Sequence, residues 1–178
     1  MTPDEVAAHV EIRHVLAVYS RGADRRDVEL AQSAFHPDAT IDLGMAPEPI
    51  NACEACAMMI RGAEQLAMTR HHHQSTVYIE MDGSDFANVE SYSVIVRSVR
   101  QPFSGEEVRQ LGGGRLIDRF ERRDGAWRIL RRVLALDYLW TGLADEDMGL
   151  LAAFPNKGRP CPDDVSYQLF SAWRTSTS

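Results

Sequence analysis

The hydrophobic pattern in the first part of the chain is helical. Residues 2–5 form a capping box with proline at the first helical position, which is a strong helix start. Apolar side chains then recur at helical spacing, which predicts a long amphipathic helix to about Arg21. Asp27 can cap a second, shorter helix over residues 28–35, and a third helix is predicted from residue 51 or 52 to about 68.

From about residue 71 onward the pattern changes to strands. Asp82-Gly83 and Asp124-Gly125 are hairpin signals that each join two long alternating runs. A short strand over 39–43 and a proline-containing loop over 44–50 precede the third helix. Helices followed by an antiparallel meander indicate an α+β fold, in which the helices cover one face of the sheet. The four long strands are predicted over 71–81, 86–100, 108–122 and 127–138.

The C-terminal segment differs from the rest of the chain. It holds three of the eight prolines and two apolar clusters, without a sustained period. Such a segment is too apolar for a disordered linker. We therefore predict one domain over residues 1–140 and an arm over 141–178 that packs on this domain or on a neighbouring subunit.

Composition excludes several classes of function. The chain has 178 residues, 44% of them hydrophobic, which is enough for one well-filled core. Its net charge of −7 argues against a nucleic-acid partner and against binding to an anionic membrane. Because there are only three cysteines and no apolar run typical of a signal peptide or a membrane span, we expect a cytoplasmic protein.

Three consecutive histidines stand at the start of the first long strand. Histidine exchanges protons near neutral pH, so these residues are candidate acid–base groups, although an exposed polar strand end is an equally good interpretation. Strict alternation turns His71 and His73 to the apolar face of the strand and His72 away from it. A bulge between residues 74 and 76 would reverse this for His72. A zinc or iron site on His71, His73 and Asp24 is a less favoured alternative.

Three further motifs have structural interpretations. Asp118 lies between apolar residues of one strand face, where an inward carboxylate would need Arg97 or Arg132 as a partner; an outward-facing salt bridge is favoured. The Cys53–Cys56 pair has redox spacing but no strand leading into it, so we interpret it as structural. The Gly112–Gly114 run lacks the lysine of a phosphate loop and is predicted to be a strand entry or bulge.

Taken together, three stretches resemble the SnoaL-like branch of the nuclear transport factor 2-like superfamily. They are the helical region 12–44, the strand RHH…EMDG over 70–83, and the segment GGGRLIDRFERRDGAWRILRRVLALDY over 112–138. The likeness covers roughly residues 5 to 140. It implies a cystatin-like cone, in which a strongly curved antiparallel sheet wraps around three N-terminal helices and encloses a deep apolar pocket.

The resemblance also implies a candidate site. Relatives that are dehydratases or dehydrochlorinases use an Asp–His pair, whose matching positions here are Asp24 and His72. The resemblance also implies the bulge that turns His72 inward. Tyr19 falls where bile-acid dehydratases carry a functional tyrosine, while the arginine of their last strand falls here near Leu136. His73, Asp118 and Trp140 complete the predicted substrate-binding residues, and we expect no metal and no cofactor.

Several activities occur on this fold, so fold alone does not decide the function. The favoured hypothesis is a dehydratase-like lyase, resembling scytalone dehydratase, that acts on a small hydrophobic cyclic or aromatic hydroxy compound. An isomerase (as in ketosteroid isomerase-like relatives) or a polyketide cyclase could use the same pair of residues. A non-catalytic binding module or the small subunit of a ring-hydroxylating dioxygenase is the third hypothesis. We expect a homo-oligomer, either a dimer or a trimer.

Overall fold

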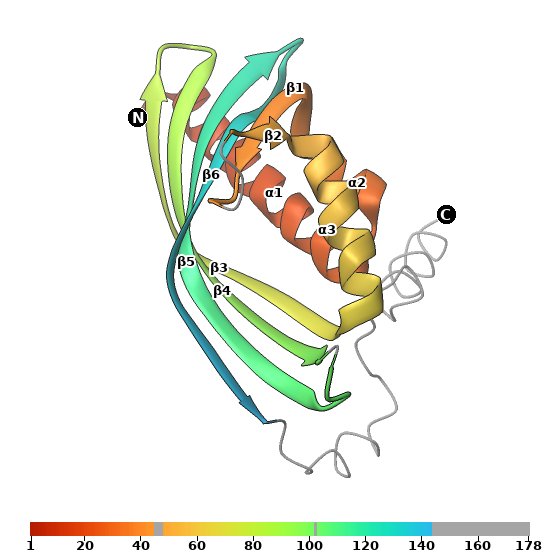
Figure 1. The fold of residues 1–178 in the computed structure, drawn as a ribbon. Coiled ribbons are helices and arrows are strands. Elements are labelled where there is room, and N and C mark those ends of the chain that lie inside the picture. The colour runs from red at the N-terminus through yellow and green to blue at the C-terminus, as the bar shows by residue number, and fades with distance from the viewer. Residues whose placement is uncertain (45–47, 102, 144–178) are drawn as a thin grey trace, which may run out of the picture.

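The computed structural model describes residues 1–44, 48–101 and 103–143, which form an α+β fold (Figure 1). Within these ranges the three helices are α1 (Pro3–Arg25), α2 (Val28–Ser33) and α3 (Ala52–Leu66). The six strands of the same ranges are β1 (Phe35–Asp42), β2 (Ile50–Asn51), β3 (Ala67–Asp82), β4 (Phe86–Arg100), β5 (Glu107–Arg123) and β6 (Ala126–Leu143). The predicted order of helices and then long strands is confirmed.

One sheet organises the molecule, with the strand order β2-β1-β6-β5-β4-β3. Strands β3 to β6 form the predicted antiparallel meander. They bend strongly, and the helices lie on the concave side of the bend (Figure 1). This is the predicted cone, in which the amphipathic helices bury their apolar faces against the inner face of the sheet.

Helix α1 begins and ends where its sequence dictates. The Thr2 hydroxyl accepts from the Glu5 backbone N–H at 3.2 Å, and the Glu5 carboxylate accepts from the Thr2 N–H at 2.8 Å, which completes the capping box. The helix closes on Arg26, which is left-handed with φ 56°. It packs closely on α2 through Gly22, where a Cβ would lie 2.4 Å from the backbone nitrogen of Ala31.

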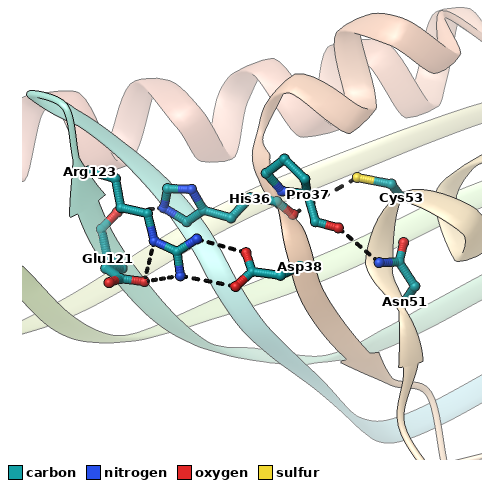
Figure 2. Close-up of polar contacts among 7 residues, drawn as sticks. All are labelled: His36, Pro37, Asp38, Asn51, Cys53, Glu121 and Arg123. Carbon is teal, nitrogen blue, oxygen red and sulfur yellow. Dashed lines mark hydrogen bonds and ion pairs between the residues drawn. The ribbon is translucent and has the colours of Figure 1, made fainter.

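A cluster of polar contacts fastens β1 to its neighbours (Figure 2). The Arg123 guanidinium donates to both carboxylate oxygens of Asp38, at 2.7 and 3.2 Å, and also contacts Glu121. The buried imidazole of His36 lies 3.0 Å from the backbone oxygen of Glu121. Asn51 of β2 donates to a β1 carbonyl group at 2.9 Å. These contacts hold the short strands against the β5–β6 hairpin.

The short strands differ from the sequence prediction in two respects. Strand β1 starts at Phe35, earlier than the predicted residue 39, and runs parallel to β6, so the sheet is not wholly antiparallel. Pro37 can sit in this strand because the β1–β6 register shifts between Phe35 and Thr40, where no ladder bond is needed. Strand β2 lies at the end of the segment predicted as a loop over 44–50, paired with β1.

The C-terminal part of the sheet continues to Leu143, where β6 ends. The predicted arm lies outside the described residues from 144 onward, so the division at residue 140 stays a prediction, as does the homo-oligomer. Among the helices of the described ranges, none combines the length and the apolar character that crossing a membrane requires.

Candidate active site

A cavity of about 400 Å³ lies between the concave face of the sheet and the helices. Its walls are mostly apolar side chains from α3, β1, β4 and β6, and the glycine run 112–114 leaves part of the β5 wall without side chains. A concave apolar site with a few convergent polar groups is typical of small-molecule binding. Among the described residues, the polar side chains that reach it are Tyr19, Arg70, His72, Ser93, Arg97 and Arg132.

A bulge in β3 turns His72 toward this cavity. Pairing with β4 joins Val77 to Ser91 but Gln74 to Ser93, so β3 carries one extra residue between these points. The extra residue reverses which side chains face inward along the strand. Val77, after the bulge, packs on the core. Gln74, directly before the bulge and three residues before Val77, shares the inner face with His72. The bulge that the resemblance implied is therefore confirmed, and strict alternation is wrong for this strand.

Asp24 and His72 form a close pair. Asp24 stands in the last turn of α1, which extends beyond its predicted end near Arg21. One carboxylate oxygen lies 2.5 Å from Nδ1 of His72, and the other accepts from the His72 backbone N–H at 2.9 Å. Both side chains are largely buried, with exposed fractions of 12% and 8%. The two contacts fix the imidazole orientation and leave Nε2 for other chemistry.

A second hollow, of about 440 Å³, lies on the other side of this pair. Asp24 and His72 both contribute to its wall, together with polar residues of α1 and β3 such as Ser20 and Gln74. His72 thus stands between an apolar cavity and a more polar hollow.

Tyr19 lies next to the imidazole on the same wall. Its ring contacts His72 edge-on, with 6.2 Å between centroids, and also packs on Phe35. The side chain is buried within the core but lines the cavity. Burial raises the pKa of the Tyr19 hydroxyl, so this group stays a neutral hydrogen-bond donor at physiological pH.

Arg132 is a buried cation in the cavity wall. It donates to both carboxylate oxygens of Asp118, at 2.7 and 2.8 Å, and neither side chain is exposed to solvent. Its guanidinium also lies over the Tyr19 ring, 4.3 Å from the centroid. Burial alone would lower the pKa of Arg132, but the paired Asp118 carboxylate outweighs it and raises the pKa. The favoured outward-facing position of Asp118 is wrong, and the alternative partner Arg132 is confirmed.

Comparison with known families identifies the chain. The model of the SnoaL-like domain matches residues 4–133. The chain belongs to the SnoaL-like family. This confirms the resemblance drawn from the sequence, and the match covers the helices, the three histidines and the first part of β6, which carries Arg132. No match to this SnoaL-like chain is found among the curated proteins.

Solved structures show the same fold. A candidate scytalone dehydratase from Novosphingobium aromaticivorans is 20% identical, covers 82% of this chain and 94% of its own, and gives a TM-score of 0.69. A type 2 hexachlorocyclohexane dehydrochlorinase, LinA, is 15% identical with the same TM-score, over 81% of this chain and 97% of its own. A variant of Rv3472, a protein of unknown function from Mycobacterium tuberculosis, is 21% identical over 98% of this chain and 95% of its own, with a TM-score of 0.62.

Of the predicted site residues of this SnoaL-like protein, the structure brings four together and leaves two apart. Tyr19, Asp24 and His72 are neighbours, and Asp118 reaches the site by holding Arg132. His73 is exposed and stacks on His71, with 6.1 Å between ring centroids, and Trp140 is 59% exposed. Neither His73 nor Trp140 is among the described residues that line the cavity, because both alternate with inward-facing neighbours on their strands. Their predicted contact with substrate is therefore not supported.

Sequence reasoning missed two arginines of the cavity wall. Arg70 lies two residues before His72 on β3, and its Cα partner on β4 is Arg97. The signal for both was available once His72 was taken to face inward, because residues two apart on a strand share a face. Within the described ranges, no group of three or more His, Cys, Asp or Glu residues is placed to hold a metal ion.

Because the thiol of Cys56 is buried, we expect this SnoaL-like protein to lose stability at alkaline pH. Burial raises the pKa of Cys56 from 9.0 to about 11, so folding favours the protonated thiol. The stabilisation is fully present below pH 9 and is lost as the pH rises through 11. It corresponds to at most about 3 kcal/mol. Urea unfolding below pH 9 and near pH 11 should show a smaller decrease in Cys56→Ala than in the wild type; parallel decreases would contradict this origin.

Proposed function

We propose that this SnoaL-like protein is a cofactor-independent lyase that removes water from a hydrophobic cyclic or aromatic hydroxy compound. The observation that carries the proposal is the pairing of Asp24 with His72 on the wall of an apolar cavity. The names of two structural neighbours, a candidate scytalone dehydratase and a dehydrochlorinase, both describe eliminations. They support an elimination as the reaction class.

His72 acts as the general base. Asp24 accepts the Nδ1 proton of His72, which fixes the tautomer and leaves the Nε2 lone pair free to accept a proton. Nε2 then removes a proton from a substrate carbon next to a carbonyl group or an aromatic ring. The C–H electron pair forms the new double bond while the C–O bond breaks. The departing hydroxyl group takes the abstracted proton back from Nε2 and leaves as water, which returns His72 to its neutral form.

Tyr19 and Arg132 stabilise the charge that develops during this step. The neutral Tyr19 hydroxyl donates to the forming oxyanion or to the departing hydroxyl group. Arg132 contributes a fixed positive charge beside Tyr19, and its Nη1 group is buried without a hydrogen-bond partner. In a cavity with apolar walls, these groups act in a low dielectric and need little reorganisation.

The proposal is tested by a screen of cyclic and aromatic hydroxy compounds, with the product mass as the readout. We expect a product lighter by one water, formed without added cofactor and equally fast in the presence of EDTA. A product of unchanged mass would replace the lyase with an isomerase or cyclase on the same pair of residues. No turnover, together with co-purification of a large iron–sulfur subunit, would favour the non-catalytic hypothesis and refute the proposal.

A further inference from the structure

We propose that the cavity recognises a carboxylate group of its ligand through Arg70 and Arg97, which makes the substrate class an apolar hydroxy acid. That the ligand is a substrate rests on the proposed function, in which the same cavity performs the reaction. The recognition of the anion itself rests on the geometry and the charge of the cavity.

Arg70 and Arg97 present two guanidinium groups to one part of the cavity. They are opposite each other on the adjacent strands β3 and β4, and both line the cavity wall. Side chains directly opposite on antiparallel strands lie about 5 Å apart at their Cβ atoms, and like charges in such positions repel. An anion held between the two groups removes this repulsion.

Neither arginine forms an ion pair with a carboxylate in the part of the chain that the structure describes. Arg70 donates to the backbone carbonyl of Ala23, and Arg97 donates through Nε to the side-chain oxygen of Gln110 at 2.7 Å. Both acceptors are neutral. Each guanidinium has five N–H donors, so each retains donors for a ligand while its position is fixed.

The charges around the cavity favour a monoanion. Among the residues that the structure describes, three arginines line it, while the lining residues and their direct partners contribute two carboxylates, Asp24 and Asp118. Asp118 compensates Arg132, and Asp24 is shared with His72. One positive charge is left over, which a single carboxylate neutralises. Burial lowers the pKa of both Arg70 and Arg97, because desolvation disfavours the charged form.

The position of this arginine pair orients a ligand with respect to the base. Arg70 and His72 are two residues apart on the same face of β3. This spacing corresponds to about 7 Å along a strand. A carboxylate at Arg70 and Arg97 therefore places the apolar body of the ligand beside His72 and toward Tyr19. The reacting carbon is then several bonds away from the carboxylate.

Equilibrium binding of three probes with the same ring system tests the proposal without turnover. The probes are naphthoate, the neutral naphthalenemethanol, and naphthyl phosphate. We expect the wild-type protein to bind naphthoate at least about 10-fold more tightly than naphthalenemethanol, since charge-assisted hydrogen bonds are made only to the anion. Equal binding of these two probes would overturn the proposal. Tighter binding of naphthyl phosphate than of naphthoate would overturn the assignment to a carboxylate.

Variants then assign the preference to these side chains. Arg70→Met and Arg97→Met should each reduce naphthoate binding by about 10-fold and leave naphthalenemethanol binding unchanged. Arg128→Met is the matched control, because it removes the same charge from an exposed position of β6 outside the cavity lining. An equal loss for both probes would indicate a packing role and refute the proposal. If the methionine variants do not fold, Arg70→Lys and Arg97→Lys, which keep the charge but not the planar fork, should still weaken naphthoate binding.

The same measurement separates this inference from the proposed function. In His72→Ala, the preference for naphthoate should persist, because recognition of the anion does not require the base. If the protein prefers naphthoate but dehydrates no hydroxy acid, the lyase is refuted and the anion site is retained. A lyase that acts equally well on neutral alcohols would refute the anion site alone.

Discussion

Replacing His72 by alanine should reduce kcat by about 10²–10⁴-fold, the usual contribution of a positioned general base. The imidazole is the only histidine side chain among the described residues of the cavity wall, and the Asp24 carboxylate orients it. The measurement is the steady-state rate with a substrate from the hydroxy-compound screen, under saturating conditions. A change confined to KM would instead indicate that His72 only binds the substrate.

The chain provides a matched control for this variant in the adjacent histidine. His73→Ala removes the same side chain from the same strand, but from its outer, exposed face. It should leave kcat unchanged. Asp24→Asn should reduce kcat as well, because an amide cannot fix the imidazole in the tautomer that leaves Nε2 basic. Full activity in His72→Ala, or an equal loss in His73→Ala, would contradict the assigned roles.

Replacing Asp118 by asparagine should cost about 3–5 kcal/mol of stability, the typical cost of breaking a buried ion pair by removing one partner. The change leaves the Arg132 cation fully buried and without its carboxylate, and Arg132 already has one nitrogen without a partner. The free energy of unfolding from urea titration measures the loss. Asp118 does not line the cavity, so the effect reports on the ion pair and not on a ligand contact.

A second aspartate provides the control for this stability measurement. Asp137 accepts from Arg115 at 3.0 Å, but this pair is exposed to solvent. Asp137→Asn should change the unfolding free energy little, since exposed ion pairs contribute little. The double change Asp118→Leu with Arg132→Met should recover most of the loss of Asp118→Asn, because two apolar side chains replace two buried charges. A double variant as unstable as the single one would contradict the explanation.

Local signals in the sequence predicted most of the fold. The capping box, the helical spacing of apolar residues and the two Asp-Gly turns are all formed by residues close in sequence, and each placed an element correctly. The parallel pairing of β1 with β6 could not be predicted in this way, because it joins residues about ninety positions apart, such as Ile41 and Arg132. Strand β2 has only two residues, too few for any period.

The candidate site depended on more than local signals. Alternation alone placed His72 on the wrong face, because no residue type in the sequence marks the extra residue of β3. The resemblance to SnoaL-like proteins supplied that bulge, and the structure confirmed it. Arg70 was not assigned to the site for the same reason, since its inward position follows from the bulge. Arg97 lies on β4, where alternation alone turns it inward, but it was considered only as a possible partner of Asp118. Asp118 was expected to face outward, because an inward carboxylate needs a buried partner. That Arg132 on β6 is this buried partner depends on packing across the sheet, which the local sequence does not reveal.

The bulge in β3 also sets how this strand can change during evolution. A deletion of one residue between Gln74 and Val77 would leave the core side chains after the bulge in place. In the part of β3 before the bulge, the side chains that face the cavity and those that face outward would exchange places. His71 and His73 would then face the cavity, while His72 and Arg70 would face outward. A change in chain length by one residue thus alters the chemistry of the site without substituting any of its residues. Relatives that keep both the core and an inward histidine at the position of His72 must keep the same residue count between them.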